Sequence, residues 1–310
     1  MKLSLQVLSD THTEYITPEK YNSYKPDEIS RLWGGFVRVC GDIVVLGGDI
    51  GNPLLESYWS FIGYVSSRCK MVLLITGNHE YWGNTVEGVE EIIRRRIKNY
   101  KNVRYLQRNF LVIDDTVFLG CTLWSYIPPQ FITQIESWAG DFKSIGECKN
   151  AGIFNSWHFR DLQWLIESIV KFRADGFKVV VLTHYTPSLE LNFNPRFNIS
   201  GASFAFSSDL SVLYPYVNCW IYGHTHYDNS RLHKYTIPGY DTIFISNQRG
   251  YPTSVKATYS SNFSIDLDEI KDKNTLAGKI AINFTSYDDK YIERIQKKLE
   301  DWIKNGKKLI

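Results

Sequence analysis

Cysteine is sparse in this chain and shows no paired spacing. The 310 residues include five Cys, and no Cys-x-x-Cys pair occurs among them. An odd number without such spacing excludes a disulfide framework and a thiolate zinc site, and it fits a reducing compartment. An excess of charge is lacking as well, because 35 Lys and Arg accompany 33 Asp and Glu, for a net charge of +2. This balance provides no strong field for nucleic acid or an anionic membrane.

Long apolar runs are also missing. None reaches the length that spans a membrane, and residues 1–10 alternate like a short strand rather than a secretory leader. We therefore expect a soluble, cytoplasmic protein. Hydrophobic residues make up 44% and aromatic residues 15% of the chain, enough for a sizeable core. For Trp124, Tyr185 and Phe204 we expect packing in the core or beside the site rather than stacking on a base.

Short apolar runs alternate with amphipathic stretches along most of the chain. The apolar runs predict strands, and the stretches with apolar residues at helical spacing predict helices. Strands are expected at 3–8, 42–46, 71–75, 103–106, 110–113, 117–121, 178–182, 217–221, 230–236 and 242–246, and helices at 54–67, 85–99 and 156–173. Residues 13–35, which contain Pro18, Pro26 and Gly34-Gly35, and residues 190–207 read as loops. The alternation of strand and helix favours an α/β fold.

Polar side chains follow five of the expected strands directly. They are Asp10 and His12, then Asp49, then Asn78 and His79, then His184, and finally His224 and His226. In a sheet built from βαβ units, the carboxyl ends of the strands meet at one edge, so these side chains are expected to converge. Each could serve a structural role alone, as a packed His, a turn Asn or a helix cap. Together they indicate a metal site.

The donor set consists of imidazole, carboxylate and carboxamide groups without thiolate. Such donors suit Mn, Fe, Zn, Ni or Mg. Two ions a few ångströms apart stabilise an in-line displacement at phosphorus and lower the pKa of water between them. Asp49 stands in the middle of the set and is the natural bridge between two ions. Glu80 either orients a ligand or caps the next helix.

Five motifs in this order resemble the calcineurin-like metallophosphoesterase superfamily: D-x-H, G-D, G-N-H-E, H and G-H-x-H. The resemblance spans residues 3–251 and implies a four-layer α/β/β/α sandwich of two mixed β-sheets flanked by helices. It implies two divalent ions, with manganese expected. One would be held by Asp10, His12, Asp49 and His226, and the other by Asp49, Asn78, His184 and His224. His79 would stabilise the transition state or protonate the leaving oxygen.

The resemblance also separates branches of the superfamily. Protein serine/threonine phosphatases carry Asp-Arg-Gly in the second motif, where this chain has Ile50-Gly51-Asn52 after Asp49. The phosphate-binding Arg of that branch is therefore absent. The chain is more similar to bacterial and viral predicted phosphoesterases that share its segments 8–14, 77–81, 122–124, 208–210 and 249–251. This similarity suggests His158, Arg249, Asp209 and Asp141 for the substrate side of the site, although each also has an ordinary structural interpretation.

The composition changes after Pro252. We expect a metallophosphoesterase domain at 1–252 and a C-terminal extension at 253–310, with a strand at 279–285 and an amphipathic helix at 288–305. The helix could cover the site or form a homodimer.

The predicted function is di-metal hydrolysis of a phosphodiester or nucleotide-type ester by a metal-bridging hydroxide, with Asp49 and His79 as the catalytic residues. A phosphomonoesterase or protein phosphatase is the alternative within enzymes. A metal-free binding scaffold is the alternative outside them.

Overall fold

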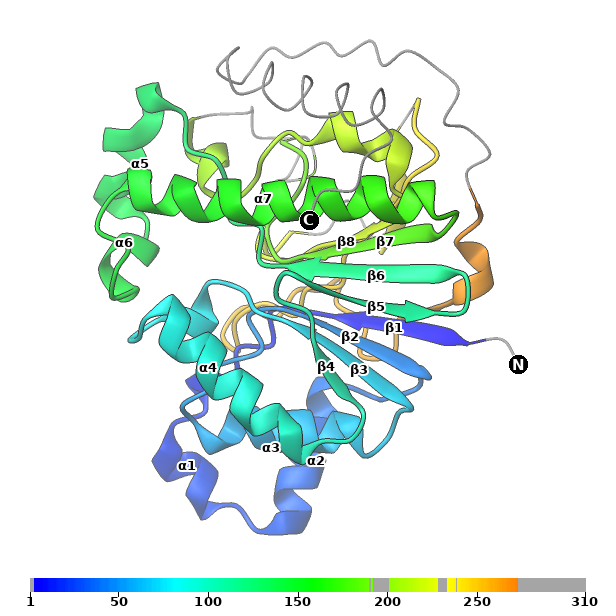
Figure 1. Ribbon diagram of the computed structural model, residues 1–310. Helices are drawn as coiled ribbons and strands as arrows, with labels where there is room; N and C mark the ends of the chain where they lie inside the picture. Colours follow the sequence, from blue (N-terminus) through cyan, green and yellow to red (C-terminus); the bar gives the residue numbers. More distant parts are fainter. Residues whose placement is uncertain (1–2, 190, 192–200, 228–232, 238, 273–310) are drawn as a thin grey trace.

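Two β-sheets stacked face to face form the centre of the molecule, and helices cover both outer faces (Figure 1). The computed structural model describes residues 3–189, 191, 201–227, 233–237 and 239–272. The predicted four-layer α/β/β/α sandwich is confirmed. The helices outside the first sheet are α1 (Pro18–Ser23), α2 (Pro26–Phe36), α3 (Glu56–Ser66) and α4 (Val86–Arg96), and those on the other side are α5 (Ile132–Trp138), α6 (Asp141–Ser144) and α7 (Ala151–Ala174).

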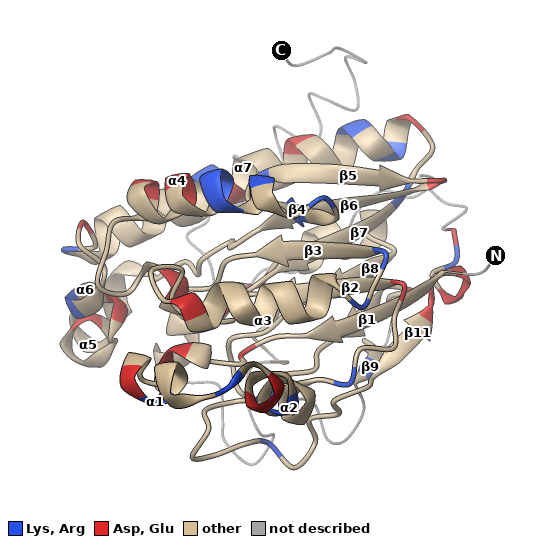
Figure 2. Ribbon diagram, turned by 90° about the horizontal axis from the view of Figure 1, so that it is seen from below, with Lys and Arg blue, Asp and Glu red and all other residues tan. Residues whose placement is uncertain are grey.

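The first sheet has the strand order β11-β1-β2-β3-β4. Its strands are β1 (Ser4–Leu8), β2 (Ile43–Gly47), β3 (Met71–Ile75), β4 (Val103–Tyr105) and β11 (Ser264–Asp266). Strands β1 to β4 are parallel, and β11 pairs antiparallel with β1. Both signs of charge occur along the helices that cover this sheet (Figure 2).

The second sheet has the order β5-β6-β7-β8-β10-β9. Its strands are β5 (Asn109–Ile113), β6 (Thr116–Cys121), β7 (Lys178–Thr183), β8 (Cys219–Ile221), β9 (Lys234–Thr236) and β10 (Ile243–Ile245). The central strands are parallel, and the edge strands β5 and β9 are antiparallel to their neighbours. Both sheets are therefore mixed, and each has a parallel centre whose strands end at one edge.

Alternate residues of the central strands serve two separate cores. On β2, Ile43 and Val45 face the second sheet, where they join a cluster that includes Phe118 and Val180. Their neighbours Val44 and Leu46 face outward into the cluster under the helices. Burial on both faces explains why these strands read as continuous apolar runs rather than as alternating ones.

The prediction of a loop over residues 13–35 is wrong, because this segment contains α1 and α2. Pro18 and Pro26 stand at the first turn of each helix, where a missing N–H costs nothing, and the Thr17 side chain caps α1. Trp33 and Phe36 on α2 are buried against Phe61 of α3. The apolar stripe thus outweighs Gly34-Gly35, which the prediction took as a break.

The sequence pattern also does not predict α5, α6 or β11, and the elements it does predict differ mainly at their ends. Strand β3 has the predicted bounds, whereas α7 begins at Ala151 because Asn150 caps it through the Ile153 N–H. Residues 264–266 of the extension belong to the first sheet. The predicted strand at 279–285 and helix at 288–305 lie outside the described residues, and the domain boundary at 252 stays a prediction. No helix in the described part of the chain is long and apolar enough to cross a membrane.

Candidate metal centre

The predicted ligands converge where strands of the two sheets end. Asp10 follows β1, Asp49 follows β2 and Asn78 follows β3 in the first sheet, while His184 follows β7 and His224 follows β8 in the second. Because all five strands run parallel within their sheets, the turns after them lie at one edge. The fold therefore assembles, from distant segments, the polar set that the sequence pattern predicts.

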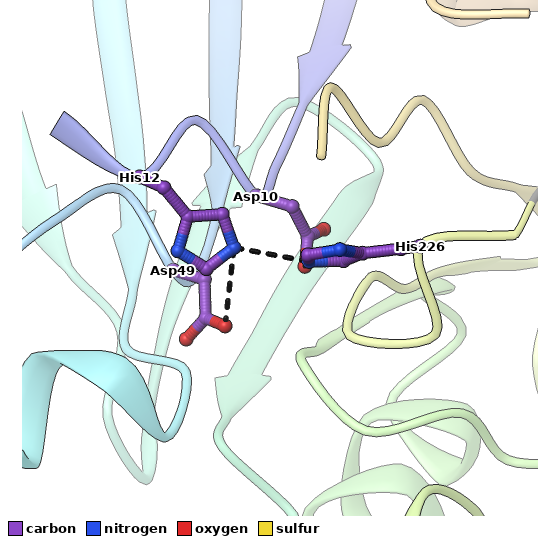
Figure 3. A group of neighbouring side chains, drawn as sticks. All are labelled: Asp10, His12, Asp49 and His226. Atoms are coloured by element: carbon purple, nitrogen blue, oxygen red, sulfur yellow. Dashed lines mark hydrogen bonds and ion pairs between the residues drawn. The ribbon is translucent and has the colours of Figure 1, made fainter. Parts of the chain in front are cut away.

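The first ligand group consists of Asp10, His12, Asp49 and His226, whose donor atoms all lie within 4.8 Å of one another (Figure 3). The Nε2 atoms of His12 and His226 are 3.0 Å apart. His226 Nε2 also lies 3.3 Å from Asp10 Oδ1, and His12 Nε2 lies 3.8 Å from Asp49 Oδ2. Two imidazole nitrogens that face each other beside two carboxylates form a donor set for a divalent cation.

The second ligand group is Asp49, His184 and His224, with donor atoms again within 4.8 Å of one another. His184 Nε2 lies 3.3 Å from Asp49 Oδ1. Asp49 thus belongs to both groups, with Oδ2 nearest His12 of the first group and Oδ1 nearest His184 of the second. A carboxylate in this position can contact two cations at once, which is the role the sequence suggests for it.

Two buried acceptors around the second group have no hydrogen-bond partner. They are Asn78 Oδ1 and His224 Nε2. The Asn78 amide donates its Nδ2 to Asp141 Oδ1 at 2.8 Å, which directs Oδ1 to the other side, and His184 Nδ1 lies 2.9 Å from Gly47 O. Unpaired buried polar atoms cost about 1–3 kcal/mol each. Nitrogen and oxygen lone pairs left free in this way fit a divalent cation.

The charges of the second group fit the same interpretation. Burial lowers the pKa of His184, but the nearby Asp49 outweighs burial and raises it to about 10. Burial lowers the pKa of His224 to about 3, so this ring stays neutral. A proton on His184 thus balances Asp49 when no cation is bound, and a bound cation would displace that proton.

Backbone strain is concentrated in the two groups. Nine non-glycine residues in the described part of the chain have a positive φ. Five of them are predicted ligands: Asp10 (55°), His12 (50°), Asp49 (52°), His224 (72°) and His226 (47°). Left-handed conformations are costly for most side chains and cluster at functional sites, where the surrounding structure holds them.

Glycines make room for the ligands. A Cβ at Gly77 would lie 2.2 Å from Asp49 Oδ1 and 2.6 Å from His184 Nε2. Gly48 has a φ of 85°, and a Cβ there would lie 2.6 Å from His184 Nδ1. The backbone at Gly48 and Gly77 thus approaches the ligands too closely for any larger residue.

Glu80 fixes the two turns that carry Asp49 and Asn78. Its carboxylate accepts the backbone N–H groups of Asp49, Ile50 and Gly77 at 2.8–2.9 Å. Burial and the charge of Asp49 raise its pKa to about 8, while these three donors favour the ionised form. Of the two roles considered from the sequence, Glu80 thus orients a predicted ligand, Asp49, through its backbone, while the Thr85 side chain caps α4.

His79 lies against the first group in a distinctive environment. Its Nδ1 is 3.1 Å from Glu14 Oε1, its Nε2 is 3.3 Å from the Tyr251 hydroxyl, and its ring stacks on Trp82 at 3.7 Å. Burial lowers the pKa of His79, but Asp49 and Glu14 outweigh burial and raise it to about 9. The ring is therefore a cation at neutral pH and can donate a proton.

The four predicted substrate residues have different surroundings. Asp141 accepts hydrogen bonds from Asn78, Trp82 and Tyr185. The other three have their described contacts elsewhere: His158 is buried and donates to Leu123 O and Trp124 O, Asp209 accepts the Ser211 N–H, and the Arg249 guanidinium lies 3.8 Å above the Phe36 ring. The structure thus brings Asp141 against a predicted ligand, Asn78.

Two site residues received no role from the sequence. Glu14 Oε1 bridges His12 Nδ1 and His79 Nδ1 at 2.9 and 3.1 Å. The Tyr251 ring lies 4.4 Å from His12 and 4.5 Å from His226. The spacing of Glu14, two residues after His12, was a usable signal, whereas the position of Tyr251 depends on the fold.

Two proteins illustrate what this chain is similar to. The chain is 25% identical over 288 residues to an uncharacterized protein of Acanthamoeba polyphaga mimivirus, which covers 86% of this chain and 97% of that protein. The structure of the present chain is similar to the crystal structure of phosphopantetheinyl hydrolase from Mycobacterium tuberculosis. The TM-score is 0.60 at 14% identity, over 89% of this chain and 99% of that one. At this identity the likeness shows a shared fold.

A family model for calcineurin-like phosphoesterases matches residues 4–228. This range runs from β1 to the second His of the Gly-His-Thr-His segment and just beyond, so it includes every predicted ligand. The chain therefore belongs to the calcineurin-like phosphoesterase family, whose members are generally metal-dependent hydrolases.

Proposed function

We propose that the protein is a di-metal phosphoesterase that hydrolyses a phosphodiester or nucleotide-type ester. The observation that carries this proposal is the position of Asp49 between two ligand groups, with one carboxylate oxygen nearest to a histidine of each. A site for a single structural ion needs no such sharing. Two adjacent cation sites suit an in-line displacement at phosphorus, in which charge develops on both the entering and the leaving oxygen.

One proposed ion is held by Asp10, His12, Asp49 and His226, and the other by Asp49, Asn78, His184 and His224. When bound, such ions supply a strong nucleophile at neutral pH by lowering the pKa of water, and they stabilise negative charge at phosphorus. We propose manganese as the natural ion, since imidazole and oxygen donors suit it. Fe, Zn, Ni and Mg are the other ions to test.

His79 is the proposed proton donor to the leaving oxygen. Glu14 Oε1 lies 3.1 Å from Nδ1 and, together with Asp49, raises the pKa of the ring, and Nε2 is the nitrogen directed toward Tyr251. Its backbone N–H donates to Asp49 Oδ1 at 2.9 Å, so His79 has a fixed position relative to the ligand that the two groups share. General-acid catalysis of this kind contributes about 10²–10⁴-fold to the rate.

A diester or nucleotide substrate is proposed over a phosphoprotein. The residue after Asp49 is Ile50, which is fully buried, where protein phosphatases have their phosphate-binding Arg. The likeness to phosphopantetheinyl hydrolase adds one compound class to test, since a phosphopantetheinyl ester is itself a phosphodiester. A cytoplasmic location and a homodimer formed through residues 253–310 remain separate predictions, the second tested by the mass of the protein in solution.

The test is hydrolysis of a bis-aryl phosphate diester and of the matching monoester, with added Mn. It compares the wild type with Asp49→Asn and with a matched control, Asp27→Asn. Asp27 forms an exposed ion pair with Arg31 on α2. We expect diester turnover that falls at least about 10³-fold in Asp49→Asn and is unchanged in Asp27→Asn. Monoester turnover alone would favour a phosphatase. No turnover together with no bound metal would favour the scaffold and overturn the proposal.

A further inference from the structure

Two large aromatic side chains near the ligand groups are exposed. Tyr15 is 53% exposed beside the first group, and Trp138, at the end of α5, is 43% exposed on the side of the second. A single exposed aromatic residue needs no explanation. Trp138, however, stacks on Phe206 at 5.9 Å and 26°, and the Phe206 ring lies 5.4 Å from that of His224. We call these two rings the Trp138–Phe206 shelf.

Residues that follow α5 fix the position of Trp138 relative to the predicted ligands. Three residues after Trp138, the Asp141 carboxylate accepts the Asn78 amide and the Trp82 indole N–H at 2.8 and 2.7 Å. Between them, a Cβ at Gly140 would lie 3.1 Å from the Trp82 ring, so the chain passes close to that ring. The end of α5 therefore has a fixed position relative to the second ligand group.

The side of Phe206 is held equally well. Its backbone N–H donates to Ser203 O at 3.0 Å, and its carbonyl accepts the Thr186 N–H at 3.4 Å, two residues after His184. The preceding short helix, Gly201–Ala205, packs through Phe204 on Phe131 with the rings stacked at 5.2 Å. The Trp138 side of the shelf is thus linked to Asn78 through the Asp141 side chain, and the Phe206 side to the backbone two residues after His184.

The other aromatic residues considered for base stacking are in the core. Trp124 and Tyr185 are fully buried and Phe204 is 5% exposed, so a substrate cannot lie on them. The Tyr185 ring instead packs 4.0 Å from that of His224, and its hydroxyl donates to Asp141. Within the described residues, Trp138 is therefore the exposed indole in ring contact with a residue packed on His224.

We propose that the Trp138–Phe206 shelf binds a planar aromatic group, a nucleobase or an aryl ring, on the ester substituent that extends past the second ligand group. The inference rests on the proposed function for the position of the phosphate. An indole offers a large flat face, and stacking of one aromatic ring on another is worth enough to change affinity by tenfold or more. The shelf would thereby select diesters with a ring over those with an alkyl or sugar substituent.

The test is equilibrium binding to the Mn-loaded full chain, which does not require turnover. The probes are adenosine 5′-monophosphate, phenyl phosphate and ribose 5-phosphate. The variants are Trp138→Ala, Trp138→Phe, and Phe110→Ala as a control, since Phe110 is 46% exposed and packs on Phe172 of α7 instead. For Trp138→Ala we expect Kd to rise at least about tenfold for the nucleotide and less than about twofold for ribose 5-phosphate.

Trp138→Phe, which keeps a ring, is expected to retain most of the affinity, and Phe110→Ala all of it. A loss confined to the nucleotide would identify a nucleobase site, and a loss shared with phenyl phosphate would identify a general aryl site. Equal losses for all three probes, no loss for any, or no binding by the wild type would overturn the inference. Ring-dependent binding by a protein that hydrolyses no ester would overturn the proposed function and leave the shelf intact.

Discussion

The two ligand groups share Asp49 but are held in different ways. In the first group the ligands contact one another, with His12 Nε2 3.0 Å from His226 Nε2 and His226 3.3 Å from Asp10. In the second group His184 Nε2 contacts Asp49 Oδ1 at 3.3 Å, but Asn78 Oδ1 and His224 Nε2 are buried without a partner, and Asp141 holds the far side of the Asn78 amide. The second group therefore keeps two unpaired acceptors, whereas the donor atoms of the first group contact one another.

This difference has an energetic consequence for metal binding. A cation in the first group would replace contacts that the ligands already make, so part of its binding energy offsets their loss. A cation in the second group would give partners to buried atoms that otherwise cost about 1–3 kcal/mol each. The second group should therefore gain more stability on metal binding, and its outer partners should matter more.

The largest expected effect is the loss of one ligand from either group. His224→Asn and His226→Asn should each remove one of two bound ions and reduce turnover at least about 100-fold, because both ions act on the same phosphate. Metal analysis and diester hydrolysis measure this. Thermal unfolding with and without Mn compares the two groups directly. Added Mn should raise the Tm of His226→Asn by several degrees more than that of His224→Asn, because only His226→Asn keeps the second group intact. Equal rises would contradict the difference between the groups.

Removing an outer partner should have the next largest effect. In Asp141→Asn the residue at 141 can offer its own N–H₂, which turns the Asn78 amide and takes Oδ1 from the site. We expect affinity for the second ion to fall about 10–100-fold, with the first ion unchanged. Stepwise Mn titration measures both in one protein. Asp209→Asn is the matched control, because that carboxylate accepts the Ser211 N–H. Unaltered affinity in Asp141→Asn would show that Asp141 does not orient the ligand.

A smaller effect is expected from His158, a buried residue of α7 that donates to the carbonyls of Leu123 and Trp124. Burial lowers the pKa of His158 from 6.5 to about 4, so the unfolded chain takes up this proton first. Stability should therefore fall as the pH drops from about 6.5 to about 4, by up to about 3 kcal/mol from this residue. Unfolding in urea at several pH values should show a shallower fall in His158→Gln. Parallel profiles for the two proteins would exclude this residue as the cause.

The smallest effect is expected from the outer partner of the first group. Ser9 Oγ donates to Asp10 Oδ2, and both side chains are buried. Because contacts within the first group already position Asp10, Ser9→Ala should lower the affinity of this group for its ion by less than about tenfold. The same titration that serves Asp141→Asn measures it. A larger loss than in Asp141→Asn would reverse the proposed order of the two groups.

The sequence predicts much of the fold because the parallel strands are buried on both faces. Apolar runs such as 71–75 have few alternative structures, and the polar residues directly after them mark the edge where a site forms. It does not predict α2, because Pro26 and Gly34-Gly35 resemble loop signals unless the burial of Trp33 and Phe36 is known. Local propensity is a weak guide where packing decides the structure.

Roles that depend on contacts between distant segments are harder to obtain from the sequence. The family resemblance suggests Asp141 as a substrate residue, but in the structure it holds Asn78, which is 63 positions away. Trp138 and Phe206 carry no motif and become notable only because their rings stack beside His224. Periodicity and spacing report neighbours along the chain, and these pairs are neighbours only in space.

The left-handed backbone at five of the predicted ligands limits how this site can change over generations. Glycine, asparagine, aspartate and histidine tolerate a positive φ better than other residues do, so few replacements are open at these positions. A descendant that abandoned metal chemistry would therefore be expected to carry glycine or asparagine there rather than an arbitrary residue. The conformation of the turns would outlast the reaction, and it would mark the former centre in a protein that no longer has one.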